Sequence, residues 1–137
     1  MIIITIPGNP VGKQRPRFGK GFTYTPKDTV NYENWVRTCF LNQEGRMLEG
    51  ELKAEIICYY SIPKSASKKK AAAMKEGNIR PIKKPDLDNI AKIILDSLNG
   101  MAYKDDSQIV ELSIKKYYGE QPLVRLCLEE IDARHNI

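Results

Sequence analysis

The order in which β-rich and helical runs alternate constrains the fold of this 137-residue chain more than any other feature. Apolar and β-branched runs predict strands over 2–6, 51–60, 109–118 and 123–131, and apolar residues at three-to-four spacing predict helices over 26–43 and 86–98. A short lysine-rich helix is predicted over 67–76. The order β-α-β-α-α-β-β predicts an α/β or α+β fold, one domain over residues 1–137 with helices packed on a mixed sheet. The last two runs are joined by a short turn with Gly119 and Pro122, so we expect an antiparallel hairpin.

Local signals mark the ends of the helices. Thr25 before Pro26 is a typical N-cap followed by a proline at the first helical position. Trp35 falls on the apolar stripe of this helix, which predicts a position in the core. Gly77 and Gly100 predict where the second and third helices end.

Histidine, cysteine and hydropathy argue against several classes of protein. His135 is the only histidine, which argues against Ser-His or Cys-His catalysis and against a histidine-ligated zinc site. Cys39, Cys58 and Cys127 form no C-x-x-C pair, and their apolar neighbours predict buried free thiols. No apolar run approaches the ~18 residues needed to cross a bilayer. We therefore expect an intracellular protein.

Two segments hold most of the positive charge. Residues 10–27 carry five basic side chains and no acidic one, and residues 61–84 carry eight against Glu76 alone. Charge separated in this way favours a polyanionic partner such as nucleic acid, although two solvated lysine-rich loops are the alternative. The basic residues expected to contact DNA are Lys13, Arg15, Arg17, Lys20, Lys64, Lys68, Lys69, Lys70, Lys83 and Lys84.

Aromatic residues interleave with the first basic segment. Phe18, Phe22 and Tyr24 stand among its glycines and basic side chains, in what we expect to be a long loop or ribbon. Aromatic faces stack on exposed bases while basic groups pair with phosphates. The alternative is a hairpin whose aromatics close the core.

Acidic residues gather where the third predicted helix begins. Asp86 and Asp88 lie at its start, where backbone amides favour negative charge. At 100° per residue Asp88 and Lys92 are about 40° apart around the axis, and Asn89 and Asp96 share the same polar flank. Asp105 and Asp106 precede the next strand.

These acids suit a magnesium site. Magnesium takes hard oxygen ligands, usually one or two carboxylates completed by water and phosphate. Such a site activates water for attack on a phosphodiester, and Lys92 would stabilise the charge of the transition state. The alternative gives each acid an ordinary role: a helix cap, an ion pair between Asp88 and Lys92, and a polar turn at Asp105-Asp106.

The same residues carry a family resemblance. The run Lys84-Pro85-Asp86-Leu87-Asp88-Asn89, then Lys92, Leu95-Asp96-Ser97-Leu98 and Asp105-Asp106-Ser107-Gln108-Ile109-Val110, resembles the RusA family of Holliday-junction resolvases. The stretches Pro10 to Arg17 and Ile62-Pro63-Lys64 resemble its phage and prophage members. One departure is Pro85, whose position is basic in some members, so phosphate contacts there are expected from Lys83 or Lys84.

The resemblance implies a role for each matching residue. Asp86, Asp88 and Asp106 would be the catalytic, metal-binding acids, Lys92 the functional lysine, and Asn89, Asp96 and Asp105 supporting residues. It further implies a RusA-like fold and a homodimer that depends on Mg²⁺ or Mn²⁺. Such an enzyme cuts four-way DNA junctions by paired symmetric nicks, in recombination and repair, in the bacterial cytoplasm. Two other functions stay open: a basic nucleic-acid-binding module without catalysis, and a metal nuclease acting on RNA or on other branched DNA.

Overall fold

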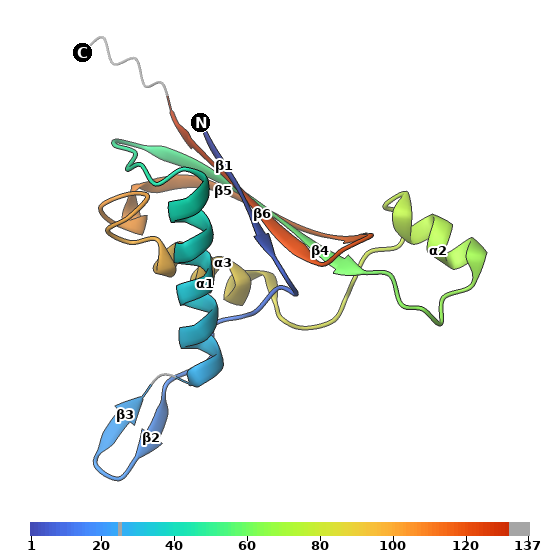
Figure 1. The fold of residues 1–137 in the computed structure, drawn as a ribbon, viewed down its shortest axis with the longest axis horizontal. Coiled ribbons are helices and arrows are strands. Elements are labelled where there is room, and N and C mark those ends of the chain that lie inside the picture. The colour runs from blue at the N-terminus through green and yellow to red at the C-terminus, as the bar shows by residue number, and fades with distance from the viewer. Residues whose placement is uncertain (25, 132–137) are drawn as a thin grey trace.

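A mixed four-stranded sheet in the order β1-β6-β4-β5 forms the framework of the protein (Figure 1). Its strands are β1 (Ile2–Pro7), β4 (Leu52–Ser61), β5 (Ile109–Gly119) and β6 (Leu123–Glu130). β6 pairs antiparallel with β1 and with β4, whereas β4 pairs parallel with β5. The computed structural model describes residues 1–24 and 26–131.

The predicted hairpin of the last two strands is wrong, because β4 lies between them. β5 and β6 run in opposite directions and are joined by a short turn, but each pairs with β4. Leu52 of β4, for example, is opposite Ile109 on one side and Glu130 on the other. The predicted mixed sheet and α+β class are confirmed.

Two helices cover one face of the sheet. α1 (Lys27–Gln43) and α3 (Leu87–Ser97) pack against each other, α1 also against β1 and α3 against β5. Along β4 the buried side chains alternate with more exposed ones, and those buried are Leu52, Ala54, Ile56, Cys58 and Tyr60. They meet Ile90, Ile93 and Ile94 of α3 in the core. This packing fixes α3 beside the edge strand β5.

The start of α1 and the place of Trp35 differ from expectation. α1 begins at Lys27 with Pro26 as its N-cap residue, and Thr25, the predicted N-cap, lies outside the described residues. The predicted core position of Trp35 is wrong: the side chain is 42% exposed, and its indole N–H donates to the Pro7 carbonyl at 2.8 Å. The indole therefore fastens α1 to the end of β1 at the surface, where its polar atom finds a partner.

Two elements project from the body. One is a ribbon of β2 (Arg17–Gly19) and β3 (Phe22–Tyr24), and the other is α2 (Lys68–Lys75), capped by the Ser67 hydroxyl (Figure 1). The first basic segment thus contains a hairpin, but Phe18 and Phe22 do not enter the core, because 86% and 58% of their surfaces are exposed.

The remaining expectations concern cysteines and membrane spans. All three cysteines are free thiols: Cys39 and Cys58 are buried and Cys127 is half-buried. Within the described ranges, no helix has both the length and the apolar character to cross a bilayer.

Candidate active site

A cavity of about 690 Å³ between α3 and β5 holds most of the predicted site residues. Asp88, Lys92 and Asp96 line it from successive turns of α3. Asp106 lines it from the short 3-10 helix η1 (Asp106–Gln108), which leads into β5. The apolar part of the wall comes from Leu87, Ala91, Leu95, Ile109, Val110, Leu112 and Ile114. Helix spacing and the packing of α3 on β5 therefore bring together acids that are far apart in sequence.

An adjoining cavity holds Asp86. It is lined by Lys13, Arg15, Asp86 and Asn89, together with Asp88 and Lys92, which line both cavities. Over residues 1–24 and 26–131, no three acidic, histidine or cysteine side chains are grouped closely enough to hold a metal ion. The three predicted ligands therefore line two joined cavities, with Asp88 common to both.

The local alternatives account for the positions of Asp86 and Asp88 only in part. Asp86 is the N-cap residue of α3, yet its side chain accepts no capping hydrogen bond from the described helix. Among the described residues, Asp88 forms no ion pair with Lys92. Both carboxylates are exposed at a helix N-terminus, where the backbone dipoles favour anions. Neither acid is used by the local fold in the way that the alternative expected.

Asp105 and Asp106 are neighbours with different surroundings. Asp105 caps η1: its carboxylate accepts a hydrogen bond from the Ser107 amide at 3.0 Å, and Gln108 completes a capping box. The bonds to Ser107 lower the pKa of Asp105. Asp106 instead donates its backbone N–H to the Asn99 side chain at 2.8 Å and lines the cavity. The polar-turn role thus belongs to Asp105, and Asp106 remains available to a ligand.

Asp106 lies against a second carboxyl group, that of Asp96. Burial raises the pKa of Asp106, and a hydrogen bond to Asp96 and the negative charges of Asp96 and Asp105 raise it further. Like charges at close range disfavour ionisation unless a cation is present between them. The pair of Asp96 and Asp106 offers the kind of oxygen ligands that Mg²⁺ takes, since Mg²⁺ needs only one or two carboxylates besides water and phosphate.

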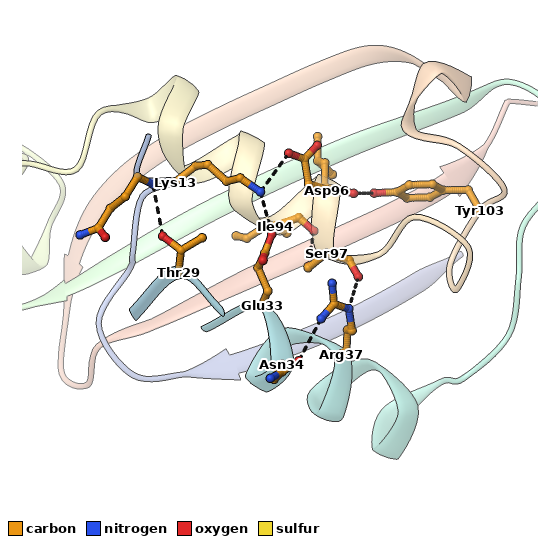
Figure 2. A network of polar contacts seen from close by, with 11 residues as sticks. Lys13, Thr29, Glu33, Asn34, Arg37, Ile94, Asp96, Ser97 and Tyr103 are labelled. Atoms are coloured by element: carbon orange, nitrogen blue, oxygen red, sulfur yellow. Dashed lines mark hydrogen bonds and ion pairs between the residues drawn. The ribbon is translucent and has the colours of Figure 1, made fainter. Parts of the chain in front are cut away.

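Lys13 connects the site to α1 (Figure 2). Its ammonium donates to Glu33 at 2.8 Å and lies 3.5 Å from Asp96. Burial lowers the pKa of Lys13, but the hydrogen bond and charge of Glu33, with those of Asp96, outweigh it, so that the pKa is raised. Lys13 is thus a half-buried cation on the outer side of the acidic pair.

Backbone contacts hold Lys13 in this place. Its N–H donates to the Asn89 carbonyl at 3.0 Å. A Cβ added to Gly12 would stand 2.7 Å from the Cβ of Pro85, so only glycine allows this approach to the start of α3. Gln14 N–H donates to the buried Thr29 hydroxyl at 3.3 Å. The segment 12–14 is therefore wedged between α1 and α3.

The C-terminal turn of α3, which carries Asp96, is fixed from two sides. The Tyr103 hydroxyl donates to the Leu95 carbonyl, and Arg37 Nε donates to the Ser97 carbonyl at 2.9 Å (Figure 2). Tyr103 is fully buried, and burial with the nearby charges of Asp106 and Asp96 raises its pKa. It acts as a neutral donor that orders this turn.

The comparison with protein families identifies the group to which the chain belongs. The family model described as "Endodeoxyribonuclease RusA" matches residues 7–129. The chain belongs to the RusA endodeoxyribonuclease family. The Bacillus subtilis (strain 168) protein "Uncharacterized protein YqaN" is 34% identical over 139 residues, which cover 96% of this chain and 98% of that protein.

Membership of the RusA family confirms the resemblance and the enzyme class. The chain is an endodeoxyribonuclease, a hydrolase, and its family indicates Holliday-junction resolvase activity on branched DNA. The match includes both acidic stretches and the basic segments. The roles of individual residues stay predictions.

Three residues that support this RusA-family site were missed in the sequence. Glu33 and Arg37 lie on α1. In the sequence, a charged residue that contacts a helix far along the chain cannot be told from a charged residue that faces solvent. Asn99 precedes Gly100, which has a φ of 78°, and looked like an ordinary turn. The sequence signal at Asn99 is its Asn-Gly pair, which predicts a turn but not a hydrogen bond to Asp106.

The predicted DNA-contacting residues differ in their surroundings. Nine of them are exposed: Arg15, Arg17, Lys20, Lys64, Lys68, Lys69, Lys70, Lys83 and Lys84. Lys13 is engaged with two carboxylates instead. Lys83 lies over the Tyr60 ring at 5.3 Å, and Arg80, not predicted, lies 4.3 Å from the centroid of Tyr117. The α2–α3 connection is thus a basic surface anchored on aromatic rings.

Proposed function

We propose that this RusA-family enzyme is a divalent-metal-dependent resolvase that cuts four-way DNA junctions by paired symmetric nicks. The observation that carries the proposal is the shared cavity of Asp88, Lys92, Asp96 and Asp106. A phosphodiester entering it would meet carboxylates suited to Mg²⁺ or Mn²⁺ beside one exposed ammonium.

Each residue has a distinct role in this proposal. Asp88 and Asp106 would hold the metal together with Asp86 once the DNA phosphate and water complete the site, and Asp96 would support Asp106 or replace Asp86 as a ligand. When bound, the metal supplies a Lewis acid and an activated water. Lys92 contacts the phosphate oxygens and stabilises their charge in the transition state. Water attacks the phosphorus and the bond from phosphorus to the 3′ oxygen breaks. The 3′ oxygen takes a proton to become the 3′-hydroxyl, and the other strand end keeps a 5′-phosphate.

The direct test uses a mobile four-way junction with Mg²⁺ or Mn²⁺. We expect the parent protein to cut opposite strands symmetrically, and Asp88→Asn to stop cutting while junction binding stays equal or becomes tighter, because a negative charge facing phosphate is removed. Asp28→Asn, an acid in the first turn of α1, is the matched control and should cut normally.

Several results would contradict this function. No cleavage of any branched DNA with either metal, together with salt-sensitive binding, would indicate a binding module without catalysis. Preferential cutting of RNA or flap substrates in parallel digests would indicate a different metal nuclease.

We also propose that the active form is a homodimer, because two equivalent cuts in a two-fold symmetric junction need two equivalent sites. The edge strand β5 carries the exposed side chains Val110 and Leu112 beside the cavity. The opposite edge is covered in part, since the Gln43 amide bonds to both backbone groups of Thr5 at 2.8 and 2.7 Å. Exposed apolar edges favour pairing between chains.

The oligomeric state of two edge-strand variants tests whether β5 or β1 forms the dimer interface. Leu112→Arg should yield a monomer in light scattering and lose paired nicking, whereas Ile3→Arg on β1 should leave the dimer intact. The reverse pattern would move the interface to β1.

We infer that the enzyme acts in recombination and repair in the bacterial cytoplasm, in a phage or prophage setting. The similarity of Pro10 to Arg17 and of Ile62-Pro63-Lys64 to phage and prophage members supports this setting. Deletion of the gene from its native chromosome, followed by measurement of recombination frequency, tests it.

A further inference from the structure

The β2–β3 ribbon presents an aromatic side chain that the fold does not use. Phe18 is 86% exposed, against 58% for Phe22 and 42% for Trp35. A phenylalanine so exposed gains little from burial in the chain itself, so its ring is free to contact a binding partner.

The ribbon is built so that its two phenylalanines face opposite ways. Phe18 pairs with Thr23, and Gly19 pairs with Phe22. Paired residues share a face and successive residues alternate, so Phe18 and Phe22 lie on opposite faces. The Phe22 ring lies over Gly19, where an added Cβ would be 2.6 Å from the ring. On the other face, Thr23 is too small to cover Phe18.

The sequence segment around Phe18 carries only positive charge. Arg15, Arg17 and Lys20 are exposed around it, and residues 10–27 contain no acid. Gly21, at a φ of 77°, closes the tight turn beyond Lys20. This combination of an aromatic face with flanking cations matches single-stranded nucleic acid, in which bases stack and phosphates pair with basic groups.

The ribbon starts at the candidate active site. Lys13, Gln14, Arg15 and Pro16 line the cavity that also holds Asp86 and Asp88. Phe18 lies two residue steps along an extended chain from Pro16, a span of roughly 7 Å. Figure 1 shows the β2–β3 ribbon extending beyond the N-terminal end of α1. A base on Phe18 would therefore belong to a nucleotide within about two or three steps of the phosphate in the cavity.

We propose that Phe18 is a stacking platform for an unpaired nucleobase at the branch point of the DNA, and that Arg15, Arg17 and Lys20 hold the flanking phosphates. The inference rests on the proposed function, because it takes the cavity as the cleavage site. Bases in an intact duplex are stacked on each other, whereas bases at a branch point are easily exposed, so the platform selects branched over linear DNA.

The test measures binding without cleavage. Four-way junctions carry 2-aminopurine either beside the scissile phosphate or in the middle of an arm, and binding is followed in EDTA by base fluorescence and by anisotropy. The variants are Phe18→Ala, Phe18→Leu and Phe18→Trp, and Leu41→Ala, an exposed apolar residue on α1, is the matched control. Circular dichroism checks that all variants are folded.

The expected results are specific to aromatic stacking. Phe18→Ala should weaken junction binding by about 5- to 150-fold, the range expected for the loss of one stacked base. It should also abolish the fluorescence change beside the scissile phosphate. Binding of linear duplex should change less than two-fold. Phe18→Trp and Leu41→Ala should behave like the parent, and the probe in the arm should not respond in any variant.

Three results would overturn the proposal. The first is that Phe18→Ala binds the junction and changes the branch-point fluorescence like the parent. The second is that Phe18→Leu binds as well as Phe18→Trp, which would indicate a plain apolar contact. A change from dimer to monomer in Phe18→Ala, with the fluorescence response retained, would place Phe18 against a second copy of the chain. If instead the parent shows the stacking signal but never cleaves with metal, the proposed function fails and the stacking inference stands.

Discussion

The surroundings of the Asp106 carboxyl group disfavour its ionised form. Its pKa is raised above the usual 3.8 by burial and by the neighbouring carboxyl of Asp96. The native state therefore binds this proton more tightly than the unfolded chain, and stability falls as the pH rises from about 3.8 through the raised pKa. At neutral pH the ionised pair destabilises the metal-free protein.

Asp106→Asn should therefore stabilise the metal-free protein at pH 7 while it abolishes cleavage. We expect the melting temperature to rise by about 1–3 °C, since a surface charge repulsion is partly screened. Differential scanning fluorimetry with and without Mg²⁺ measures this, and the increase given by Mg²⁺ in the parent should be absent in the variant. A lower melting temperature at pH 7 would show that Asp106 has a structural role.

The reactivity of the three cysteine thiols tests how deeply each is buried. Burial raises the pKa of the Cys58 thiol to about 11, so roughly one molecule in a thousand carries the thiolate at pH 8. In a thiol-disulfide assay with a chromogenic reagent at pH 8, Cys127 should react first in the native protein. All three cysteines should react at once in denaturant. Rapid modification of Cys58 in the native state would contradict its burial.

Residue-scale prediction from sequence succeeded where helix geometry alone decides. Asp88, Lys92 and Asp96 are separated by whole turns, so their common side of α3 could be predicted. Asp106 is brought to them by the packing of α3 on β5, which local patterns do not encode. Its contact with Asp96, rather than with Asp86, could not be foreseen for that reason.

At the scale of elements, the segment 12–14 joins α1 to α3 through Lys13. Replacing this lysine with methionine removes the cation between Glu33 and Asp96. We expect Lys13→Met to reduce the cleavage rate at saturating protein by about 10- to 100-fold, because Asp96 and the start of α3 lose their fixed position. Single-turnover kinetics measures the rate separately from binding.

Matched variants test the origin of this effect. Lys27→Met removes an exposed charge at the first residue of α1 and should cut like the parent. Adding Glu33→Gln to Lys13→Met should recover part of the stability, since Glu33 is otherwise left half-buried without its cation. If Lys13→Met weakens binding while the rate at saturation is unchanged, Lys13 contacts phosphate directly instead.

The wrong predictions for elements concern the β5–β6 hairpin and the core position of Trp35, and both came from local sequence patterns. Two β-rich runs with a four-residue connection favour a hairpin, yet β4 occupies the position between β5 and β6. Trp35 matched the apolar spacing of α1, but it lies beside the buried stripe that contains Tyr32 and Val36, where Pro7 accepts its N–H. The periodicity of apolar residues predicted which segments are strands and helices. It could not predict which strands pair, because pairing depends on the whole chain.

For the whole molecule, the two basic segments lie on separate projections, with α3 in the body between them (Figure 1). The triple substitution Lys68→Gln, Lys69→Gln and Lys70→Gln on α2 should weaken binding of all DNA by a similar factor. The slope of log affinity against log salt should fall by up to about 3, if each lysine neutralises one phosphate. Anisotropy titrations at several salt concentrations measure the slope.

The cleavage rate at saturation should not change in this triple variant, because α2 is remote from the cavity residues. Lys53→Gln, on the open face of β4, is the control and should leave the slope unchanged. An unaltered slope in the triple variant would mean that these lysines are solvated, as the alternative for the second basic segment holds.

The central place of β4 has a consequence for how the protein forms on the ribosome. β4 leaves the tunnel well before β5 and β6, yet it pairs with both, from Leu52 opposite Ile109 to Tyr59 opposite Leu123. Pairs so distant in sequence close slowly, because a long loop must be ordered first. Nascent chains arrested before β6 should therefore expose the apolar face of β4 and be bound by chaperones or cut by proteases, and protection should appear in a single step once β6 has emerged.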